Sequence, residues 1–195
     1  MRRVAFVFLF LLAVGSVQAQ TLKNGIGLRL GEPFGITYKH YLPKNKAVEF
    51  IVGTAHRGWG NKYYRNYYEE IEKYDDYIYR SHEVKSTVFL EARYLFQYTI
   101  PTEDLKGTLQ WYWGIGGLLK VARVEYQYEE MVSPNNTFRD ERTDIDIGPE
   151  AIGGIELTLQ NTPVSFFGES SLIFEIVDQP LALRFFGAVG ARYNF

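Results

Sequence analysis

The sequence contains no cysteine among its 195 residues and only three histidines. The absence of cysteine excludes a disulfide scaffold, a thiol nucleophile and every cysteine-based metal site. Basic residues are not in excess either, because 21 lysines and arginines stand against 23 aspartates and glutamates. A nucleic-acid-binding domain needs a concentrated basic face, so we expect no nucleic-acid partner. No apolar run reaches the roughly 20 residues that a membrane-spanning helix requires.

The amino terminus has the pattern of an export signal. Arg2 and Arg3 precede an unbroken apolar run, residues 4–14, and small residues follow up to Ala19. This order of charged, apolar and small residues is typical of a cleaved signal peptide. The remaining length suits a single domain of about eight strands. We therefore expect a signal peptide, residues 1–19, followed by one β-barrel domain, residues 20–195.

The segment from Leu181 to Phe195 alternates between two faces. Successive side chains of a strand point to opposite faces, and here one face is uncharged while the other carries Arg184 and Arg192. An apolar stripe long enough to cross a bilayer, ending on a terminal aromatic residue, is typical of a transmembrane β-barrel strand. The uncharged face consists of Leu181, Leu183, Phe185, Gly187, Val189, Ala191, Tyr193 and Phe195.

The same period of two recurs along the whole chain between turn signals. We predict an all-β fold, an eight-stranded antiparallel transmembrane up-and-down β-barrel. Short connections at residues 43–46, 100–106 and 160–163 alternate with long polar ones at 58–82 and 127–142, the asymmetry of periplasmic turns and outer loops. The first and last outer connections, near residues 32–34 and 178–180, are short exceptions. The predicted strands are residues 24–31, 35–42, 47–57, 83–98, 107–124, 143–159, 163–177 and 181–195.

Charge placement supports a barrel that is apolar outside and polar inside. On the five longest predicted strands, the charged residues lie on one face, apart from Arg123 next to the end of the strand at residues 107–124. A lipid-facing stripe excludes charges, whereas a lumen accepts them. A soluble lipocalin-like barrel has the reverse polarity and is the alternative fold. The expected inward charges are Arg29, Lys39, Lys85, Arg93, Lys120, Arg184 and Arg192 together with Glu49, Glu91, Asp146, Glu150, Glu156, Glu169 and Glu175.

These inward charges nearly balance, so we expect them to pair and to plug the lumen. In the last hairpin, a turn near Pro180 places Glu175 opposite Arg184 and Glu169 diagonally from Arg192. The alternative is a path for protons or ions along the carboxylates.

Three segments resemble small outer-membrane β-barrel proteins of Gram-negative bacteria, the OmpA, OmpX and OmpW type. They are the first predicted strand, GIGLRLG beginning at Gly25, the segment GITYK beginning at Gly35, and the final segment, FFGAVGARYNF beginning at Phe185. The resemblance implies an outer-membrane location in contact with outer-membrane lipids and lipopolysaccharide. It also implies insertion by the outer-membrane assembly machinery, which reads a terminal aromatic strand such as the one with Tyr193 and Phe195. Barrels of this type share a fold and differ in role.

The segment that begins at Gly58 and ends at Ser81 is rich in tyrosine and acidic residues. Rigid amphipathic tyrosines suit a surface that binds a protein or a glycan. The alternative is that two long strands continue past the membrane as a hairpin, with tyrosines stacking between strands. The tyrosines concerned are Tyr63, Tyr64, Tyr67, Tyr68, Tyr74, Tyr77 and Tyr79.

An enzyme is the second functional hypothesis. His56 and His82 bracket the tyrosine-rich segment, and Ser81 precedes His82. Outer-membrane lipid A deacylases and acyltransferases use a histidine base and a serine nucleophile at such a rim. The alternation, however, places both histidines outward and Ser81 inward.

No pair of candidate ligands has the close spacing of a metal site, so we expect neither a metal nor another cofactor. We predict a non-enzymatic protein with a structural or surface-interaction role through its outer loops. A lipid A-modifying enzyme and a narrow pore for small solutes remain the alternatives.

Overall fold

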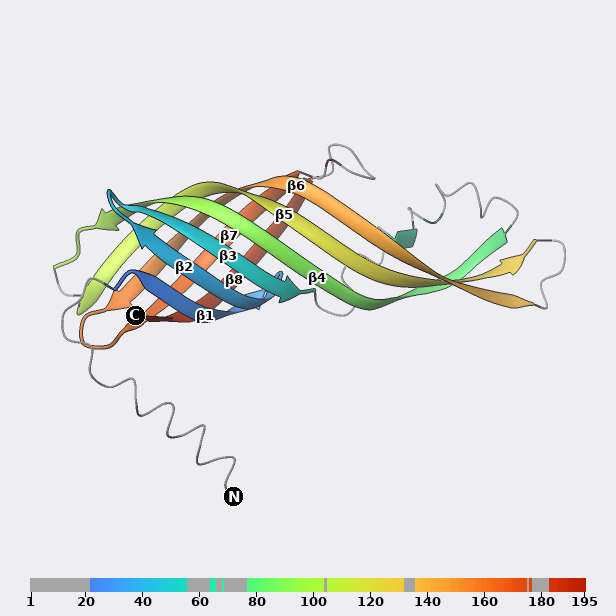
Figure 1. Ribbon diagram of the computed structural model, residues 1–195, viewed down its shortest axis with the longest axis horizontal. Helices are drawn as coiled ribbons and strands as arrows, with labels where there is room; N and C mark the ends of the chain where they lie inside the picture. Colours follow the sequence, from blue (N-terminus) through green and yellow to red (C-terminus); the bar gives the residue numbers. More distant parts are fainter. Residues whose placement is uncertain are drawn as a thin grey trace, which may run out of the picture.

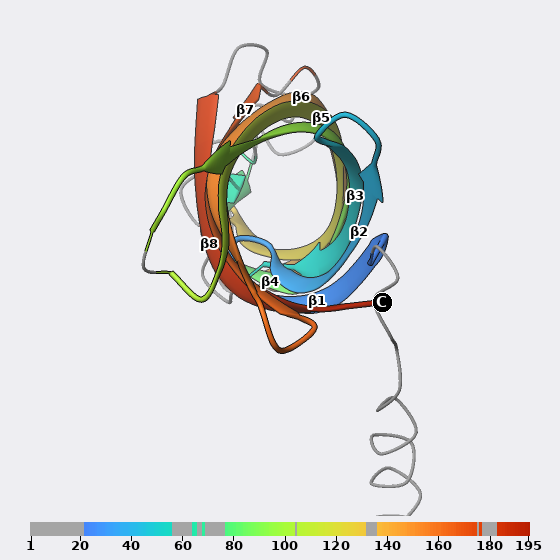
Figure 2. The same ribbon diagram turned by 90° about the vertical axis from the view of Figure 1, so that its left-hand side faces the viewer.

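The computed structural model describes residues 22–55, 64–65, 68, 77–103, 105–131, 136–174, 176 and 183–195. Each strand pairs antiparallel with the next, and β1 also pairs with β8, so the sheet closes on itself. Figure 1 shows the barrel from the side, and Figure 2 shows the closed ring along its axis. The predicted eight-stranded up-and-down barrel is confirmed. Its strands are β1 (Asn24–Gly31), β2 (Phe34–Leu42), β3 (Lys46–Thr54), β4 (Tyr77–Ile100), β5 (Gly107–Glu130), β6 (Thr137–Leu159), β7 (Val164–Phe174) and β8 (Leu183–Asn194).

The barrel end that holds the carboxyl terminus also holds the connections from β2 to β3, from β4 to β5 and from β6 to β7, whereas the two-residue connection from β1 to β2 lies at the opposite end (Figure 1). Between β2 and β3, Lys44 and Asn45 have φ angles of 63° and 57°. Left-handed residues of this kind suit the twist of a tight hairpin. The last residue is fixed to the first strand, because the Phe195 N–H donates to the carbonyl of Asn24 at 2.8 Å and the Phe195 carbonyl accepts from the Asn24 N–H at 2.9 Å. We call this end of the barrel the turn end.

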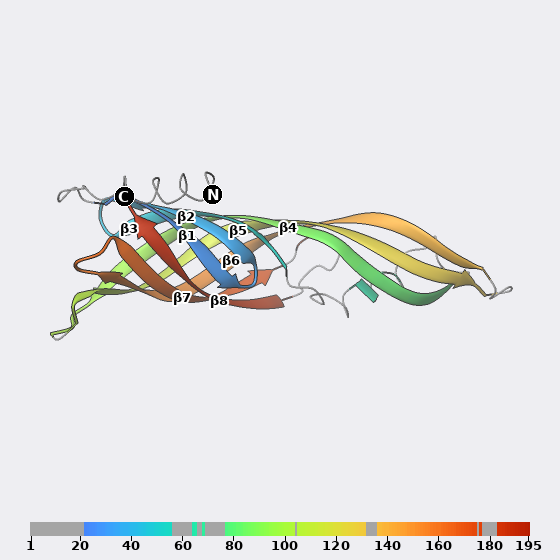
Figure 3. The ribbon, with the colours of Figure 1, turned by 90° about the horizontal axis from the view of Figure 1, so that it is seen from below.

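Three strands are much longer than the other five and continue past the opposite end of the barrel (Figures 1 and 3). The last β3 residue paired with β4 is Gly53, opposite Phe89, and the last β7 residue in the β6 ladder is Ile173, opposite Glu150. Beyond these pairs β4, β5 and β6 form a three-stranded sheet, the outer extension. The prediction of long polar loops was therefore wrong in part, because strand structure occupies residues 77–82, 127–130 and 137–142.

Two β-bulges interrupt β4 within this extension. The register with β5 shifts between Tyr79 and Ser81 and again between Val84 and Ser86. A bulge places one extra residue in a strand, so the residues on either side of it no longer follow a simple alternation of faces.

The bulges overturn three predicted orientations. Lys85, expected inside, is exposed at the second bulge. His82, expected outside, lies opposite the buried Tyr126 and shares its inner face. Ser81, expected inside, is exposed, and its hydroxyl donates to Gln127 at 3.3 Å.

The barrel wall itself has the predicted polarity, and the lipocalin-like alternative is wrong. On β5, Trp111, Trp113 and Ile115 are exposed outward, whereas Tyr112 and Lys120 are buried inside. Outward aromatic rings stack across neighbouring strands near the turn end, with centroid distances of 4.7 Å for both Phe96 with Trp113 and Tyr98 with Trp111. Within the described residues, no helix is both long and apolar enough to cross a membrane.

Candidate functional site

The middle of the barrel interior holds a buried network of charged side chains, which we call the lumen network. Each member is at most 7% exposed. Four cations stand against five carboxylates, so the predicted near balance of charge holds within this network. Its members are Arg29, Lys39, Arg93 and Arg192 with Glu49, Glu91, Glu150, Glu156 and Glu169.

Arg93 on β4 is the centre of the lumen network. Its guanidinium contacts Glu150 through two nitrogens at 2.6 and 2.8 Å and Glu169 at 2.8 Å. The same group lies 2.7 Å from Glu91 and 3.5 Å from Glu49. A planar guanidinium is suited to several carboxylates at once, because its five N–H donors point in fixed directions. Arg93 thus joins strands β3, β4, β6 and β7 through the interior.

Arg192 on β8 forms the second centre. Its guanidinium donates to Glu49 and, at 2.5 Å, to Glu156, and it lies 3.7 Å from the ring centroid of Phe167. Lys39 donates to the same Glu156 at 3.0 Å, and the hydroxyl of Tyr41 donates to the other oxygen of that carboxylate at 2.8 Å. These contacts link β2, β3, β6 and β8 across the lumen.

The pairing predicted for the last hairpin was wrong. Arg184 lies opposite Ile173, so the β7–β8 register differs by two residues from the predicted one, and Glu175 lies outside the described residues. Glu169 is not a partner of Arg192; it accepts from Arg29 at 2.9 Å and from Arg93 across the lumen. The interior is narrow enough for long side chains to reach non-adjacent strands.

Inward glycines make room for the largest side chains of the network. A Cβ atom at Gly116 would lie 2.9 Å from Cγ of Arg93, and one at Gly154 would lie 2.6 Å from Cζ of Tyr112. Tyr112 is 1% exposed, and its hydroxyl donates to Glu169 at 2.8 Å. The glycines therefore set where these side chains cross the lumen.

An apolar layer lies next to the lumen network. Phe89, Leu118, Ile173 and Phe186 form one buried cluster, in which the rings of Phe89 and Phe186 meet edge to face with centroids 6.1 Å apart. These side chains are at most 5% exposed. Like the members of the lumen network, these side chains are buried in the barrel interior.

A second charged group follows towards the outer extension. Lys120 contacts Asp146 and lies 2.9 Å from Asp144, and all three residues are buried. Lys120 and Asp146 were predicted to face the lumen. Asp144 was missed, although it lies on the same face of β6 as Asp146 and the alternation reaches it. Arg184, also predicted inside, is half-buried.

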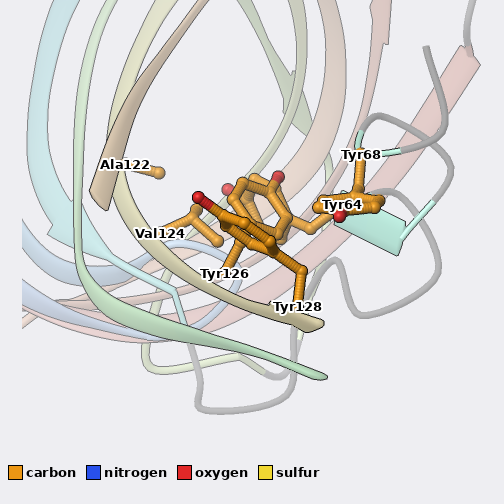
Figure 4. Packing of buried hydrophobic residues seen from close by; sticks show 6 residues of the cluster. All are labelled: Tyr64, Tyr68, Ala122, Val124, Tyr126 and Tyr128. Carbon is orange, nitrogen blue, oxygen red and sulfur yellow. The ribbon is translucent and has the colours of Figure 1, made fainter. Parts of the chain in front are cut away.

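Tyrosines cover this second charged group. Tyr64 is fully buried, and its ring centroid lies 5.4 Å from the ammonium of Lys120. Tyr64 and Tyr68 pack against Tyr126 and Tyr128 of β5 (Figure 4). We call these four tyrosines the tyrosine cap. Burial, reinforced by the carboxylates of the second charged group, raises the pKa of Tyr64, so its hydroxyl stays protonated.

The tyrosine-rich segment is therefore not a uniform exposed surface. Tyr64 and Tyr68 are buried in the cap, while Tyr77 and Tyr79 on β4 are partly buried and pack against it. The last two confirm in part the alternative in which strands continue as a stacked hairpin, since the Tyr77 ring meets that of Tyr128 at 4.9 Å. Tyr63, Tyr67 and Tyr74 lie outside the described residues.

Ser81 and His82, two of the three candidate catalytic residues, lie on different faces. His82 is on the inner face of the extension, where its Nδ1 lies 2.6 Å from the hydroxyl of Tyr79, and burial lowers its pKa. Ser81 is on the outward face, so the two side chains point away from each other. His56 lies outside the described residues. Within the described part of the chain, no three histidine or acidic side chains are grouped as metal ligands.

Comparison with known proteins finds likeness among solved structures. No protein-family model matches the sequence. No curated protein matches it either. Among solved structures, the chain is similar to the N-terminal β-barrel domain of Pseudomonas aeruginosa OprF, with a TM-score of 0.39 and 9% identity over 88% of this chain and 94% of that one.

Proposed function

We propose that this protein is an integral outer-membrane β-barrel with a sealed lumen, which acts without enzymatic chemistry through its outer extension. The observation that carries the proposal is the uncharged outer wall. Between Lys46 at the turn end and Arg123 at the other, the outward positions of the described strands carry no charge, and many large apolar side chains are exposed. Soluble monomers rarely expose an apolar surface that encircles them. A bilayer covers such a wall favourably.

The orientation follows from the two unequal ends. Barrels of the outer membrane have short turns on the periplasmic side and longer structures on the cell surface. The turn end and the carboxyl terminus therefore face the periplasm, and the outer extension stands on the cell surface. From Arg123 to the end of β5 at Glu130 the extension measures roughly 25 Å along the strand.

The filled interior favours a structural or surface role over a pore. The lumen network, the apolar layer and the tyrosine cap follow one another along the axis, and their members are almost fully buried. Ions crossing such an interior would have to displace paired charges and an apolar layer.

The outer extension is suited to contact with other molecules at the cell surface. On β6, residues 137–146 pair with β5 without a register shift, and no described residue pairs with their other edge. A regular edge that no described residue pairs with offers backbone donors and acceptors to a partner. The bulges in β4 make the opposite edge irregular. We therefore infer that a partner contacts the β6 side of the extension.

Cysteine labelling tests location and orientation, because the natural chain has no cysteine to interfere. Gln127→Cys lies on the extension and Asn45→Cys in a short turn. On intact cells, a membrane-impermeant maleimide is expected to label the first and not the second, while both react after the cells are broken. Equal labelling of the two on intact cells overturns the orientation. A purified, signal-cleaved protein that stays monodisperse without detergent overturns the membrane location.

Conductance in planar bilayers tests the sealed lumen. The natural protein is expected to add no conductance, whereas the double variant Phe89→Ala with Arg93→Ala, which removes bulk from both layers, is expected to conduct. Steady conductance of the natural protein would instead favour the narrow pore. The surface role is tested by deleting the outer extension and measuring how much of a partner molecule binds to the cell surface. Loss of that binding supports the role, and unchanged binding contradicts it.

A further inference from the structure

The outward face of the β4–β5–β6 sheet changes from polar to apolar within one residue pair. Arg123 on β5 lies opposite Ser86 on β4 and Thr143 on β6, and all three are exposed. Towards the turn end, the next outward residues on these strands are Val88, Val121 and Ile145. Arg123 therefore stands at the boundary between the apolar wall and the extension, flanked by two hydroxyl groups.

Arg123 has no protein partner within the described residues, where it forms neither a hydrogen bond nor an ion pair. The cations of the lumen network, in contrast, all contact carboxylates. The neighbouring exposed cation, Lys85, is already paired with Glu83 at 2.8 Å and lies 3.5 Å from Glu125. An unpaired guanidinium at a membrane boundary is available to an anion from outside, and its fork of donors fits a phosphate.

An apolar groove lies on the same face, nearer the middle of the barrel. Ala92 and Gly117 lie opposite each other on β4 and β5, and these small residues leave a depression of about 410 Å³. A Cβ atom at Gly117 would meet only the carbonyl oxygen of Gly148, at 4.0 Å. A second depression of about 460 Å³ shares Ala92 and Phe50 with the first. The outward side chains around the two are Val48, Phe50, Val52, Leu90, Tyr94, Ile115, Leu119 and Ile147.

The spacing of the cation and the groove matches one leaflet of a membrane. Gly117 is six positions from Arg123, roughly 20 Å along the strand. With a strand tilt of about 40°, this corresponds to roughly 15 Å of depth. Half of a typical hydrocarbon core is also about 15 Å. A phosphate held at Arg123 would therefore leave an acyl chain long enough to cross its leaflet ending in the groove.

We propose that this column of β4–β6 binds a phosphorylated glycolipid of the outer leaflet, with a phosphate at Arg123 and an acyl chain in the groove at Ala92 and Gly117. The inference rests on the proposed function, which places this end of the barrel at the cell surface. Negative charge restricts how far from the apolar wall the phosphate can lie. The next outward residues beyond Arg123 form a row of carboxylates that repel a phosphate, namely Glu83, Glu125 and Glu141.

A glycolipid fits better than a simple phospholipid because polar side chains continue above the phosphate level. Ser81, Gln127 and Arg139 lie opposite one another on the outward face of the extension. Hydroxyl, amide and guanidinium groups are suitable hydrogen-bond partners for sugars. A phospholipid headgroup is too short to reach them.

The test uses the full signal-cleaved barrel in phosphatidylcholine nanodiscs that contain small equal amounts of diphosphorylated lipid A and phosphatidylglycerol. Native mass spectrometry counts the lipids that stay bound when the nanodisc is removed. The natural protein is expected to retain lipid A in preference to phosphatidylglycerol. Arg123→Ala removes the phosphate contact and is expected to reduce retention of lipid A about tenfold, the size of one charge-assisted contact. Gly117→Leu fills the groove and is expected to reduce retention of lipid A by about the same factor. Ala92→Leu fills the same groove from β4 if Gly117→Leu fails to fold.

Two matched variants control for charge and bulk. Lys46→Ala removes a cation at the turn end, and Gly168→Leu adds bulk at an outward glycine on β7 where a Cβ atom meets only Val189, at 3.8 Å. Both are expected to retain lipid A as the natural protein does. Equal loss in the controls, equal retention of phosphatidylglycerol, or equal retention of dephosphorylated lipid A overturns the glycolipid site. Failure of the natural protein to enter nanodiscs overturns the proposed function instead.

Discussion

Replacing Arg93 with methionine removes the cation with the most carboxylate contacts in the lumen network. Glu49 and Glu169 keep other cations, Arg192 and Arg29 respectively. Glu91 and Glu150 have Arg93 as their only cationic contact among the described residues. The variant therefore leaves two buried carboxylates without a counter-charge.

The expected cost follows from that count. Breaking a buried ion pair by removing one partner typically costs about 3–5 kcal/mol, because an uncompensated charge stays in a poorly solvated place. With two carboxylates affected, we expect Arg93→Met to lie at the upper end of that range. Urea unfolding from lipid vesicles, followed by tryptophan fluorescence, measures the difference. Arg123→Ala, an exposed and unpaired arginine, is the control and is expected to change stability by about 0.5 kcal/mol or less.

A rescue variant separates charge from shape. Adding Glu91→Gln and Glu150→Gln to Arg93→Met removes both uncompensated charges while keeping the side-chain volumes. Since neutral replacements of buried ionic groups are often tolerated, the triple variant is expected to regain most of the lost stability. A cost of Arg93→Met below about 1 kcal/mol, or a triple variant no more stable than the single one, refutes the reasoning.

Three further predictions concern the wall, the interior and the extension. Ile115 is 61% exposed at the middle of the β5 stripe, so Ile115→Arg is expected to cost about 2–4 kcal/mol in vesicle unfolding, and Leu109→Arg at the margin about 0–1 kcal/mol; equal costs contradict the membrane position. Gly154→Val, whose Cβ would lie 2.6 Å from Tyr112, is expected to lose about 1–3 kcal/mol in the same assay, and unchanged stability contradicts the packing. Because burial lowers the pKa of His82, an NMR titration of its ring is expected to give a midpoint below 6.5, and a midpoint above 6.5 refutes this. The outer extension is then expected to lose stability as the pH falls below 6.5, because the unfolded chain binds the proton more readily than the folded one.

The wall of the barrel was predictable because one physical rule governs each of its residues. Trp111 and Trp113 face outward while Tyr112 faces inward, as strict alternation requires. The charges of the lumen network fall on the inner face for the same reason. Only two environments, apolar and polar, have to be distinguished, and the sequence separates them at almost every step.

The extension and the charge partners were less predictable, for two different reasons. The bulges at Arg80 and Lys85 change the faces of β4 without glycine, proline or any other local signal, so His82 was assigned to the wrong side. Pairs such as Arg29 with Glu169 depend on the distance across the closed ring, which hairpin neighbours do not reveal. Tyr126 was missed for a simpler reason, because the predicted β5 strand ended two residues before it.

The contacts of Arg29 and Arg192 bear on how the ring is completed during biogenesis. These arginines belong to the first and last strands, and their carboxylate partners lie on β7, β3 and β6. The bonds from Arg29 to Glu169 and from Arg192 to Glu49 cross the seam between β1 and β8, so they cannot form while these two strands are apart. Pairing of β1 with β8 and pairing of these interior charges are therefore one cooperative event. An intermediate in which the two strands are apart has unpaired charges, which favour closure.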